Sequence, residues 1–486
     1  MFNIQLNNIS QNGTMDCQFK IECRGYTNQE QNPDHHTLIN LNDQQICDDF
    51  WDGSVVFSKT AEIGQNVLRE GQNTIKIDSP GDTKAASDII FINYIEMNYW
   101  QKNIASQDSF LFEYSGTGIH QFEIDNFSSD KVHVFDITNP DPVKIVSMLG
   151  KNVGDSYTIN FKDDLKGSKK YFVAGENYLQ TPVIEPDQPS QLHDVTNSAG
   201  YIIITHQQFA HDVEPLVLHR RQYGLKVKVV DIQDIYDEFN YGNKNPEAIK
   251  DFLSYAYFNW QKPAPAYVLL VGDASYDFKD YLGTGNTDLV PTHLFESRYY
   301  NTETASDNWF VCVNGDDNMP DMLIGRLPVR TTNELNVVIN KIIHYETTPV
   351  DGHWNKKLLF FADKKDDYSS FKEYSDTLIS RQVPEGIDIE RVYLDDFQAV
   401  AFARQEIFYT INTGCLVAHY FGHGGIEFLA KKKLLTINDV AQFTNHEKQP
   451  FLVSLSCLNG FFHHAQIPRS LAESVLIDNE HGMIGC

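Results

Sequence analysis

The sequence predicts a doubly wound α/β sheet that follows an all-β N-terminal region. After about residue 190, apolar runs of strand length alternate with amphipathic segments of helical length, which is typical of parallel α/β folds. Before it, short runs of alternating apolar and polar residues are separated by turn residues. Between the two patterns lies the stretch Thr181–Ser190, in which residues 182–189 include three prolines. This composition favours an extended connector. We therefore expect three parts: 1–190, 191–350 and 351–486.

The N-terminal part reads as an antiparallel sandwich or jelly roll. His35 and His36 stand beside Asp34, and we expect them in an exposed loop, because no third and fourth metal ligand is nearby in the sequence. Strand-like runs occupy residues 55–57, 74–77, 89–97, 121–124 and 131–137.

The α/β part begins with a buried strand and then alternates. Gly224 is a natural helix stop, Asn245-Pro246 opens a helix with proline at its first position, and Thr332 is a plausible N-cap. Strands are expected at 201–205, 225–231, 267–273, 357–363, 391–393, 416–421 and 451–455, and helices at 212–223, 246–260, 332–345 and 371–380.

Composition excludes several function classes. The chain has 486 residues, 41% of them hydrophobic, so it can bury a sizeable core, and its formal charge of −27 argues against nucleic acid as a partner. No apolar run is long enough to span a bilayer. The seven cysteines are scattered without the spacing of a disulfide scaffold or a zinc site.

Two strand ends carry reactive side chains followed at once by glycine or a short turn. The first run, 416–421, leads into Gly422-His423-Gly424, and the second, 451–455, leads into Ser456-Cys457-Leu-Asn-Gly. Ligands bind outside the carboxyl ends of strands in open parallel sheets. If the two strands are neighbours, an imidazole and a thiol face each other across that edge.

Such a pair performs nucleophilic catalysis. A nearby histidine takes the proton of a thiol and makes it a nucleophile, and the N–H groups of Gly424 and Cys457 are placed to hold an oxyanion. Taken alone, Cys457 is better explained as a buried structural cysteine and His423 as a satisfied core histidine. The joint pattern reverses that balance.

These residues resemble the gingipain family of cysteine peptidases. The resemblance rests on His423-Gly424 and on Ser456-Cys457-Leu-Asn-Gly-Phe, extends through Pro320–Pro328 and Ser470–Ser474, and covers roughly Tyr201 to Cys486. It implies a caspase-like peptidase domain with 351–486 as the catalytic subdomain, His423 as base and Cys457 as nucleophile. The β-rich region ahead of that domain is most similar to the sortase-like members that serve type IX secretion.

The resemblance also implies an acid that orients the histidine and a second acid near the specificity pocket. Both come from the segment 290–309, where Glu296 and Asp307 are the matching candidates, with ordinary loop acids as the alternative. His293 and Glu427 are weaker alternates.

No cofactor is required by this chemistry, and no metal ligand is assigned. The acidic loops 272–280 and 313–318 are typical of solvated loops, and neither has the spacing of an EF-hand. Because gingipains carry structural calcium, the resemblance makes a structural calcium ion an expectation without naming its ligands.

The resulting hypothesis is a cysteine endopeptidase or transpeptidase that removes C-terminal sorting domains from secreted proteins and attaches them to the cell surface. Its partners would be protein substrates, outer-membrane secretion components and lipopolysaccharide, in an extracytoplasmic location. The alternatives are a broad gingipain-like endopeptidase and an inactive binding or scaffold protein. The chain lacks a signal segment at Met1 and ends in a strand-like run at Cys486, so we expect it to be a fragment.

Overall fold

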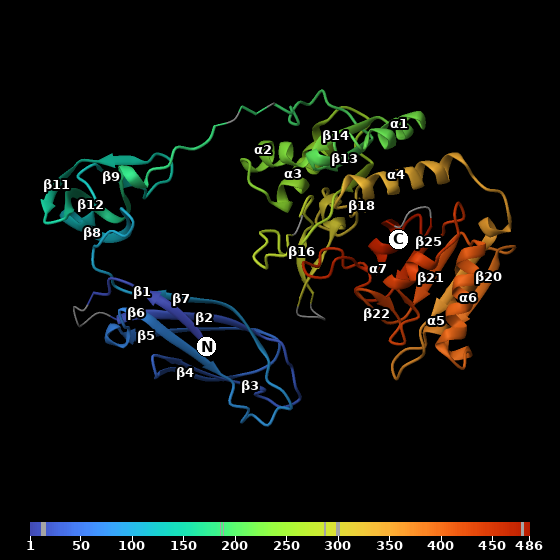
Figure 1. Cartoon of the computed structure of the whole chain (residues 1–486), viewed down its shortest axis with the longest axis horizontal. Helices are drawn as coiled ribbons and strands as arrows, with labels where there is room; N and C mark the ends of the chain where they lie inside the picture. Colours follow the sequence, from blue (N-terminus) through green and yellow to red (C-terminus); the bar gives the residue numbers. More distant parts are fainter. Residues whose placement is uncertain (11–15, 185, 188, 286–287, 298–301, 478–480) are drawn as a thin grey trace. The chain divides into compact units, whose positions relative to one another are not determined.

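The computed structural model shows a chain in two compact units, Met1–Pro186 and Asp187–Cys486 (Figure 1). It describes all residues except 11–15, 185, 188, 286–287, 298–301 and 478–480. Each unit is described by itself. Within the described part of the chain, no helix combines the length and the apolar character needed to cross a membrane.

The first part of unit 1 is a pair of antiparallel sheets that share one core. Phe19 and Ile21 of one sheet and Ile39 and Ile75 of the other are fully buried in it. One sheet has the order β1 (Phe2–Leu6), β6 (Gly71–Asp78), β3 (His35–Leu41), β4 (Gln44–Trp51), and the other has β5 (Val56–Gly64), β2 (Asp16–Gly25), β7 (Ile90–Asn98).

The second part of unit 1 is an antiparallel sheet with its own core. Two long strands, β8 (Ser109–Phe127) and β12 (Ser156–Gly175), pair along most of their length. Shorter strands complete the sheet: β9 (Val132–Asp136), β10 (Lys144–Val146) and β11 (Met148–Val153). Ile124, Val134 and Tyr171 are buried together. The expected all-β region is therefore confirmed.

The two histidines at the start of β3 are buried, so the expectation of an exposed loop is wrong. His35 Nδ1 lies 2.6 Å from Asp88 Oδ1, and His36 contacts Asp82 through Nδ1 at 2.7 Å and Asp48 through Nε2 at 3.0 Å. Each ring stacks on an aromatic neighbour. Aspartates supplied by distant segments compensate the buried rings, which the local sequence does not reveal.

His36 makes the stability of unit 1 depend on pH. Burial lowers its pKa, but the hydrogen bonds to Asp48 and Asp82 outweigh burial and leave the pKa raised. A raised folded-state pKa gives stability that is present below about pH 6.5, the unfolded value, and is lost as pH rises through the folded pKa. We expect the denaturation midpoint of this unit to fall between pH 6 and pH 9.

The variant His36→Gln should flatten that pH dependence, and urea titrations at several pH values measure it. His120→Gln is the control, because His120 is half-buried on β8 and its Nε2 lies 3.1 Å from the carbonyl oxygen of Thr117, with no carboxylate partner among the described residues. An unchanged pH slope in His36→Gln would show that other groups carry the effect.

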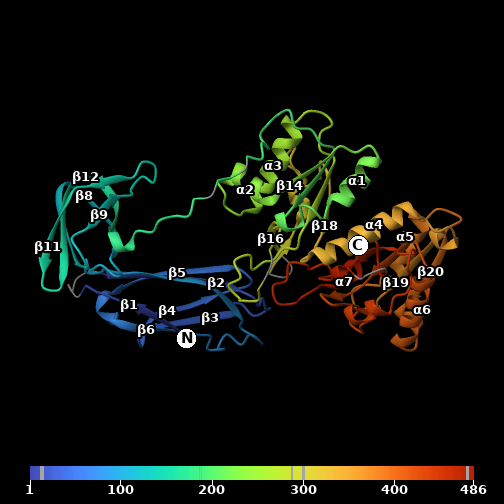
Figure 2. The same ribbon diagram turned by 45° about the horizontal axis from the view of Figure 1, so that its top comes forward.

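Unit 2 contains two four-stranded parallel sheets with the same strand order (Figures 1 and 2). In each sheet the first strand along the chain lies between the second and the third, and the fourth follows the third. The first sheet has the order β14 (Val227–Asp231), β13 (Tyr201–Thr205), β15 (Tyr267–Val271), β18 (Leu323–Leu327). The second has β20 (Asp388–Tyr393), β19 (Lys357–Ala362), β21 (Val417–Phe421), β25 (Phe451–Leu455).

Helices cover both faces of each sheet. They are α1 (Glu214–Gln222), α2 (Ile232–Asn240), α3 (Pro246–Asn259), α4 (Thr332–Thr347), α5 (Phe371–Gln382), α6 (Val400–Thr413) and α7 (Leu471–Ile477). Asn245 caps α3 as expected, whereas α4 is capped by Thr331, one residue before the expected Thr332, in a capping box with Glu334.

The short helix α7 connects the two halves of unit 2. Leu471 and Val475 pack in the core of the second sheet, and Leu476 and Ile477 pack with α1 and α4 in the core of the first. The antiparallel sheets followed by parallel α/β sheets are the fold class that the sequence predicts.

Small elements complete the chain. Two-stranded and three-stranded sheets are formed by β16 (Leu294–Ser297) with β17 (Thr302–Ala305) and by β22 (Gly424–Gly425), β23 (Phe428–Leu429) and β24 (Leu435–Thr436). The 3₁₀ helices are η1 (Gln65–Val67), η2 (Glu176–Tyr178), η3 (Gln207–Phe209), η4 (Asp307–Val311), η5 (His353–Lys356), η6 (Leu394–Asp396) and η7 (Ile437–Gln442).

Candidate active site

The two reactive residues lie at the ends of neighbouring parallel strands, which confirms that β21 and β25 are adjacent. Phe421 pairs with Leu455, and the N–H of Gly422 donates to the carbonyl of Leu455 at 3.2 Å. His423 and Cys457 each stand two residues beyond that paired position. The chain reverses its strand order around β19 and β21, which is where open α/β sheets bind ligands.

The imidazole of His423 is hydrogen-bonded to an acid that follows the adjacent strand β19. His423 Nε2 lies 2.7 Å from Asp366 Oδ2. An ionised carboxylate only accepts hydrogen bonds, so Nε2 carries the proton and Nδ1 is left to accept one. This is the tautomer that a general base needs.

Asp366 is held in place by its own loop. Its Oδ1 accepts the N–H groups of Tyr368 at 2.9 Å and Ser369 at 2.7 Å. The bond from Tyr368 and then the one from His423 hold the pKa of Asp366 below its ordinary value. The carboxylate therefore stays ionised at neutral pH and stabilises a positively charged His423.

The backbone of the His423 turn is fixed from two sides. The Tyr420 hydroxyl and the Ala430 N–H both donate to the carbonyl of His423, each at 2.7 Å. Phe371, the first residue of α5, presents its ring edge-on to the imidazole with 5.3 Å between centroids. The ring that would act as base therefore sits on a well-supported turn.

Cys457 lies on an exposed, tight turn next to Gly424. The thiol-bearing residue is exposed, and Leu458 after it has φ +62°, a left-handed conformation that is unusual for leucine. A Cβ on Gly424 would lie 2.8 Å from both the Cys457 carbonyl oxygen and the Ser456 hydroxyl. Only glycine allows the turn that carries His423, called the base turn, and the turn that carries Cys457, called the nucleophile turn, to approach this closely.

In the small sheet of β22, β23 and β24, the N–H of Gly424 points away from the neighbouring strand β23. Gly424 pairs with Leu429, and the next bond of the ladder is donated by Ala430 to His423. Residues of antiparallel pairs alternate between bonded and unbonded positions, so Gly424 occupies an unbonded one. Its N–H therefore points away from β23, and the Gly424 backbone lies against Ser456 and Cys457.

Glu296 and Asp307 are the candidates for two roles, an acid that orients His423 and an acid near the specificity pocket. Asp307 begins η4, and its carboxylate accepts Arg326 Nε at 2.6 Å, Arg326 Nη2 at 2.8 Å and the Thr292 hydroxyl at 2.8 Å. Glu296 is exposed on β16. The structure brings Asp366, rather than Asp307 or Glu296, to the imidazole.

The pairing with Arg326 gives Asp307 a structural role. Arg326 is almost fully buried and its other N–H groups donate to the carbonyls of Gly272, Val290 and Pro291. Removing one partner of a buried ion pair costs about 3–5 kcal/mol. We expect Asp307→Ala to lower the free energy of unfolding of unit 2 by about that amount.

Glu296→Ala is the matched control, because a change at an exposed position alters stability by no more than about 0.5 kcal/mol. Urea denaturation of both variants measures their free energies of unfolding and so tests the prediction. If Asp307→Ala is as stable as the parent protein and only its activity is lost, the structural assignment is wrong and a functional one is restored.

The weaker alternates are also placed. His293 stacks on Trp309 with 3.9 Å between ring centroids, and burial lowers its pKa. Glu427 lies in the turn between β22 and β23, where its carbonyl accepts the N–H of Ile437.

Two carboxylates of the first acidic loop, 272–280, accept hydrogen bonds from backbone N–H groups of the same segment. Asp277 accepts the N–H groups of Tyr281 and Leu282, and Asp280 accepts those of Thr284 and Gly285. Outside the gaps in the described chain, no three carboxylate, histidine or cysteine side chains gather to hold a metal. Structural calcium stays a prediction, and no step below depends on it.

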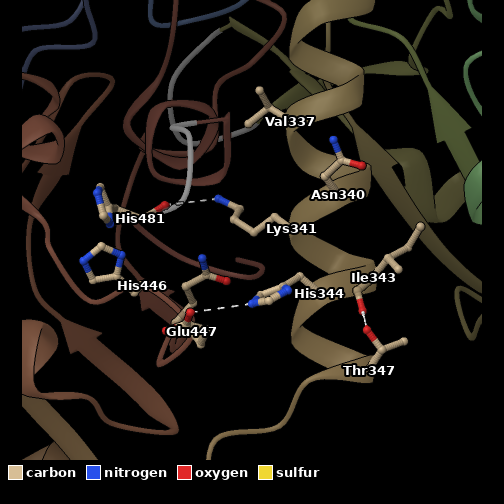
Figure 3. A pocket seen from close by; sticks show the side chains of 10 residues that line it. Val337, Asn340, Lys341, Ile343, His344, Thr347, His446, Glu447 and His481 are labelled. Carbon is tan, nitrogen blue, oxygen red and sulfur yellow. Dashed lines mark hydrogen bonds and ion pairs between the residues drawn. The ribbon is translucent and has the colours of Figure 1, made fainter.

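A large cavity of about 960 Å³ lies away from these catalytic candidates. Figure 3 shows it between α4 and the segment around Glu447, with His344, His446 and His481 among the residues that line it. None of its lining residues belongs to the strand-end site.

Sequence reasoning missed Asp366. It follows the expected strand 357–363, just as His423 and Cys457 follow theirs, and this shared position is the signal that was available. Recognising it required knowing that β19 lies beside β21, which the apolar pattern does not state.

The fold and the site together define the gingipain-like class of cysteine peptidases. The pattern of Peptidase family C25 matches residues 194–486, more than half of the chain. The chain therefore belongs to Peptidase family C25, and unit 2 is its caspase-like α/β domain.

Named relatives agree with this assignment. The chain is 24% identical over 297 residues to Gingipain R2 of Porphyromonas gingivalis, covering 60% of this chain and 35% of that protein. It is 24% identical over 268 residues to Lys-gingipain W83 of the same organism, covering 54% of this chain and 14% of that protein. The chain thus spans about a third or less of the length of these relatives.

A solved structure extends the similarity. Dimeric latent PorU from Porphyromonas gingivalis matches with a TM-score of 0.52 and 18% identity, over 71% of this chain and 35% of that one. At this identity the match shows the fold alone.

Proposed function

We propose that this protein is a cysteine peptidase that forms a thioester on Cys457. The observation that carries the proposal is the row of three side chains at neighbouring strand ends. Cys457 is exposed after β25, His423 follows β21, and Asp366 after β19 holds the far nitrogen of the imidazole.

The first half of the reaction forms the acyl-enzyme. His423 Nδ1 takes the thiol proton, and the Cys457 sulfur attacks the peptide carbonyl to form a C–S bond and a tetrahedral oxyanion. The N–H groups of Gly424 and Cys457 stabilise that oxyanion. The C–N bond then breaks, and His423 returns its proton to the leaving amine.

The second half releases the acyl group. His423 removes a proton from an acceptor, which is water in hydrolysis or an amine in transfer, and the acceptor displaces the Cys457 sulfur. The thiolate regains a proton from His423. Asp366 stays ionised throughout and balances the charge on the imidazolium.

We propose further that the protein is a sortase of type IX secretion. It would remove the C-terminal sorting domain of a secreted protein and join the new end to an amine of a cell-surface lipopolysaccharide. This is supported by the antiparallel β unit ahead of the peptidase unit and by the similarity of fold to PorU. On this proposal the protein acts outside the cytoplasm, in contact with outer-membrane secretion components.

The test uses the whole chain and a reporter protein that carries a C-terminal sorting domain. Mass spectrometry of the reporter's new C-terminus, with and without an added amine, distinguishes the outcomes. An amide at the cut end is the expected result. A free acid alone, at many sites, would favour the gingipain-like endopeptidase.

The third hypothesis is an inactive binding or scaffold protein that keeps the peptidase fold. A peptide that carries a thiol-directed electrophile tests this hypothesis. Rapid labelling of Cys457, mapped by peptide mass, is expected for an enzyme. Labelling no faster than that of the other exposed cysteine, Cys486, would favour the scaffold.

A further inference from the structure

A buried amide clamps the turn that carries Cys457. Asn459 accepts a hydrogen bond from the Ser456 hydroxyl at 2.9 Å through Oδ1 and donates to the Ser454 hydroxyl at 2.8 Å through Nδ2. The two serine hydroxyls lie 3.1 Å from each other. One side chain thus closes a ring of hydrogen bonds from the end of β25 to the residue before the nucleophile.

The backbone of Asn459 holds the same turn. Its N–H donates to the carbonyl of Cys457 at 2.8 Å. This bond spans Leu458, whose φ of +62° is a costly conformation for a residue with a branched side chain. Such a conformation persists only where the surrounding contacts determine it, and Asn459 supplies them from both sides of Cys457.

The clamp grips the atoms that set the distance to the base. The Ser456 hydroxyl and the Cys457 carbonyl are the two groups closest to the vacant Cβ position of Gly424, each at 2.8 Å. They are also the two groups that Asn459 holds, through Oδ1 and N–H respectively. Gly424 directly follows His423, so Asn459 fixes the spacing between the nucleophile turn and the base turn.

Asn459 is itself attached to the scaffold. It is 6% exposed, and its carbonyl accepts the N–H of Ala472 at 2.9 Å in the first turn of α7. Since α7 packs in the cores of both sheets, its bond to Asn459 holds the nucleophile turn in place relative to both sheets of unit 2.

We propose that Asn459 is a positioning residue for the reaction at Cys457. The inference rests on the proposed function, because it concerns the approach of the thiol to His423 and to the substrate carbonyl. Misplacement by about 1 Å costs about a hundredfold in rate. Loss of the clamp should therefore lower kcat while leaving substrate binding, and so KM, nearly unchanged.

The experiment compares Asn459→Ala with Asn445→Ala in the whole chain. Asn445 is a matched control, since it is 2% exposed and clamps Gly482 through Nδ2 at 2.7 Å and Oδ1 at 3.0 Å. Both variants lose a buried amide clamp in unit 2. Steady-state kinetics on the reporter and the rate of Cys457 labelling by the peptide electrophile are measured, with the folded fraction taken from near-UV circular dichroism.

Asn459→Ala should lower kcat about 10- to 100-fold with KM changed less than about twofold. Asn445→Ala should lose stability but keep kcat per folded molecule. Asn459→Asp keeps the acceptor for Ser456 and loses the donor to Ser454, so an intermediate kcat is expected.

Two results would overturn the inference. One is an unchanged kcat in folded Asn459→Ala, and the other is an equal fall of kcat in Asn445→Ala. If Asn459→Ala does not fold, Ser454→Ala decides, because it removes half of the clamp and should lower kcat about 3- to 10-fold; an unchanged kcat there also contradicts the inference. An unreactive parent protein would instead contradict the proposed function.

Discussion

Replacing Cys457 by alanine should abolish both peptide cleavage and labelling by the peptide electrophile while the protein stays folded. Cys457 is exposed and lies beyond the end of β25, so its sulfur adds little to the core. Every covalent step of the proposed reaction requires that sulfur. The measurement is turnover of the reporter, with thermal unfolding as the check on folding.

Cys312→Ala is the control for this change. Cys312 is a half-buried free cysteine of unit 2 whose Sγ donates to the carbonyl of Asn308 at 3.3 Å. This variant should keep full activity. A folded Cys457→Ala protein that still cleaves would rule out the thioester.

The second large effect is expected for Asp366→Asn. The amide can present its NH₂ group to Nε2 and favour the wrong tautomer, and it cannot balance an imidazolium, so kcat should fall by about 10²- to 10⁴-fold. KM should change little, because Asp366 contacts His423 and its own loop rather than substrate. Steady-state kinetics on the reporter measures both constants.

Asp367→Asn tests whether charge alone matters, since it removes the same charge from an exposed position in the same loop. That variant should behave like the parent protein. Glu296, a candidate that the resemblance implies, provides the opposing outcome: a large loss of kcat in Glu296→Gln with none in Asp366→Asn would assign the orienting role to Glu296.

The local pattern of the sequence was enough to place the candidate nucleophile and the candidate base at neighbouring strand ends. Apolar runs without alternation mark strands buried on both faces, and the residues that follow them fall at one edge of a parallel sheet. His423 and Cys457 could therefore be placed before strand pairing was known. The glycine at position 424 added the close approach that the structure shows.

Asp366, the acid that contacts His423, was not predictable in the same way. Which strand lies beside β21 depends on how the helices wind the chain, and this order is a property of the whole sheet. Asp366 follows a strand about sixty residues earlier in the chain, so no local spacing connects it with His423. The resemblance pointed instead to Glu296 and Asp307, and the nonlocal partner of Asp307, Arg326, is visible only in the folded chain.

Similar limits applied in unit 1. The strands β8 and β12 are long and largely polar, so only the short alternating run 121–124 of β8 was predicted. The burial of His35 and His36 depends on aspartates that arrive from other loops. In both cases the structure depends on contacts between residues far apart in the sequence, and the local composition of a strand or loop does not reveal them.

The central claim is that peptide cleavage passes through a thioester on Cys457. The most direct measurement is mass spectrometry of the intact protein after rapid acid quenching during turnover of the reporter, followed by peptide mapping. The account predicts an adduct with the mass of the acyl portion, located on Cys457 and accumulating in parallel with release of the amine product. Cleavage without any adduct on Cys457, in a protein whose activity survives alkylation of that thiol, would contradict it.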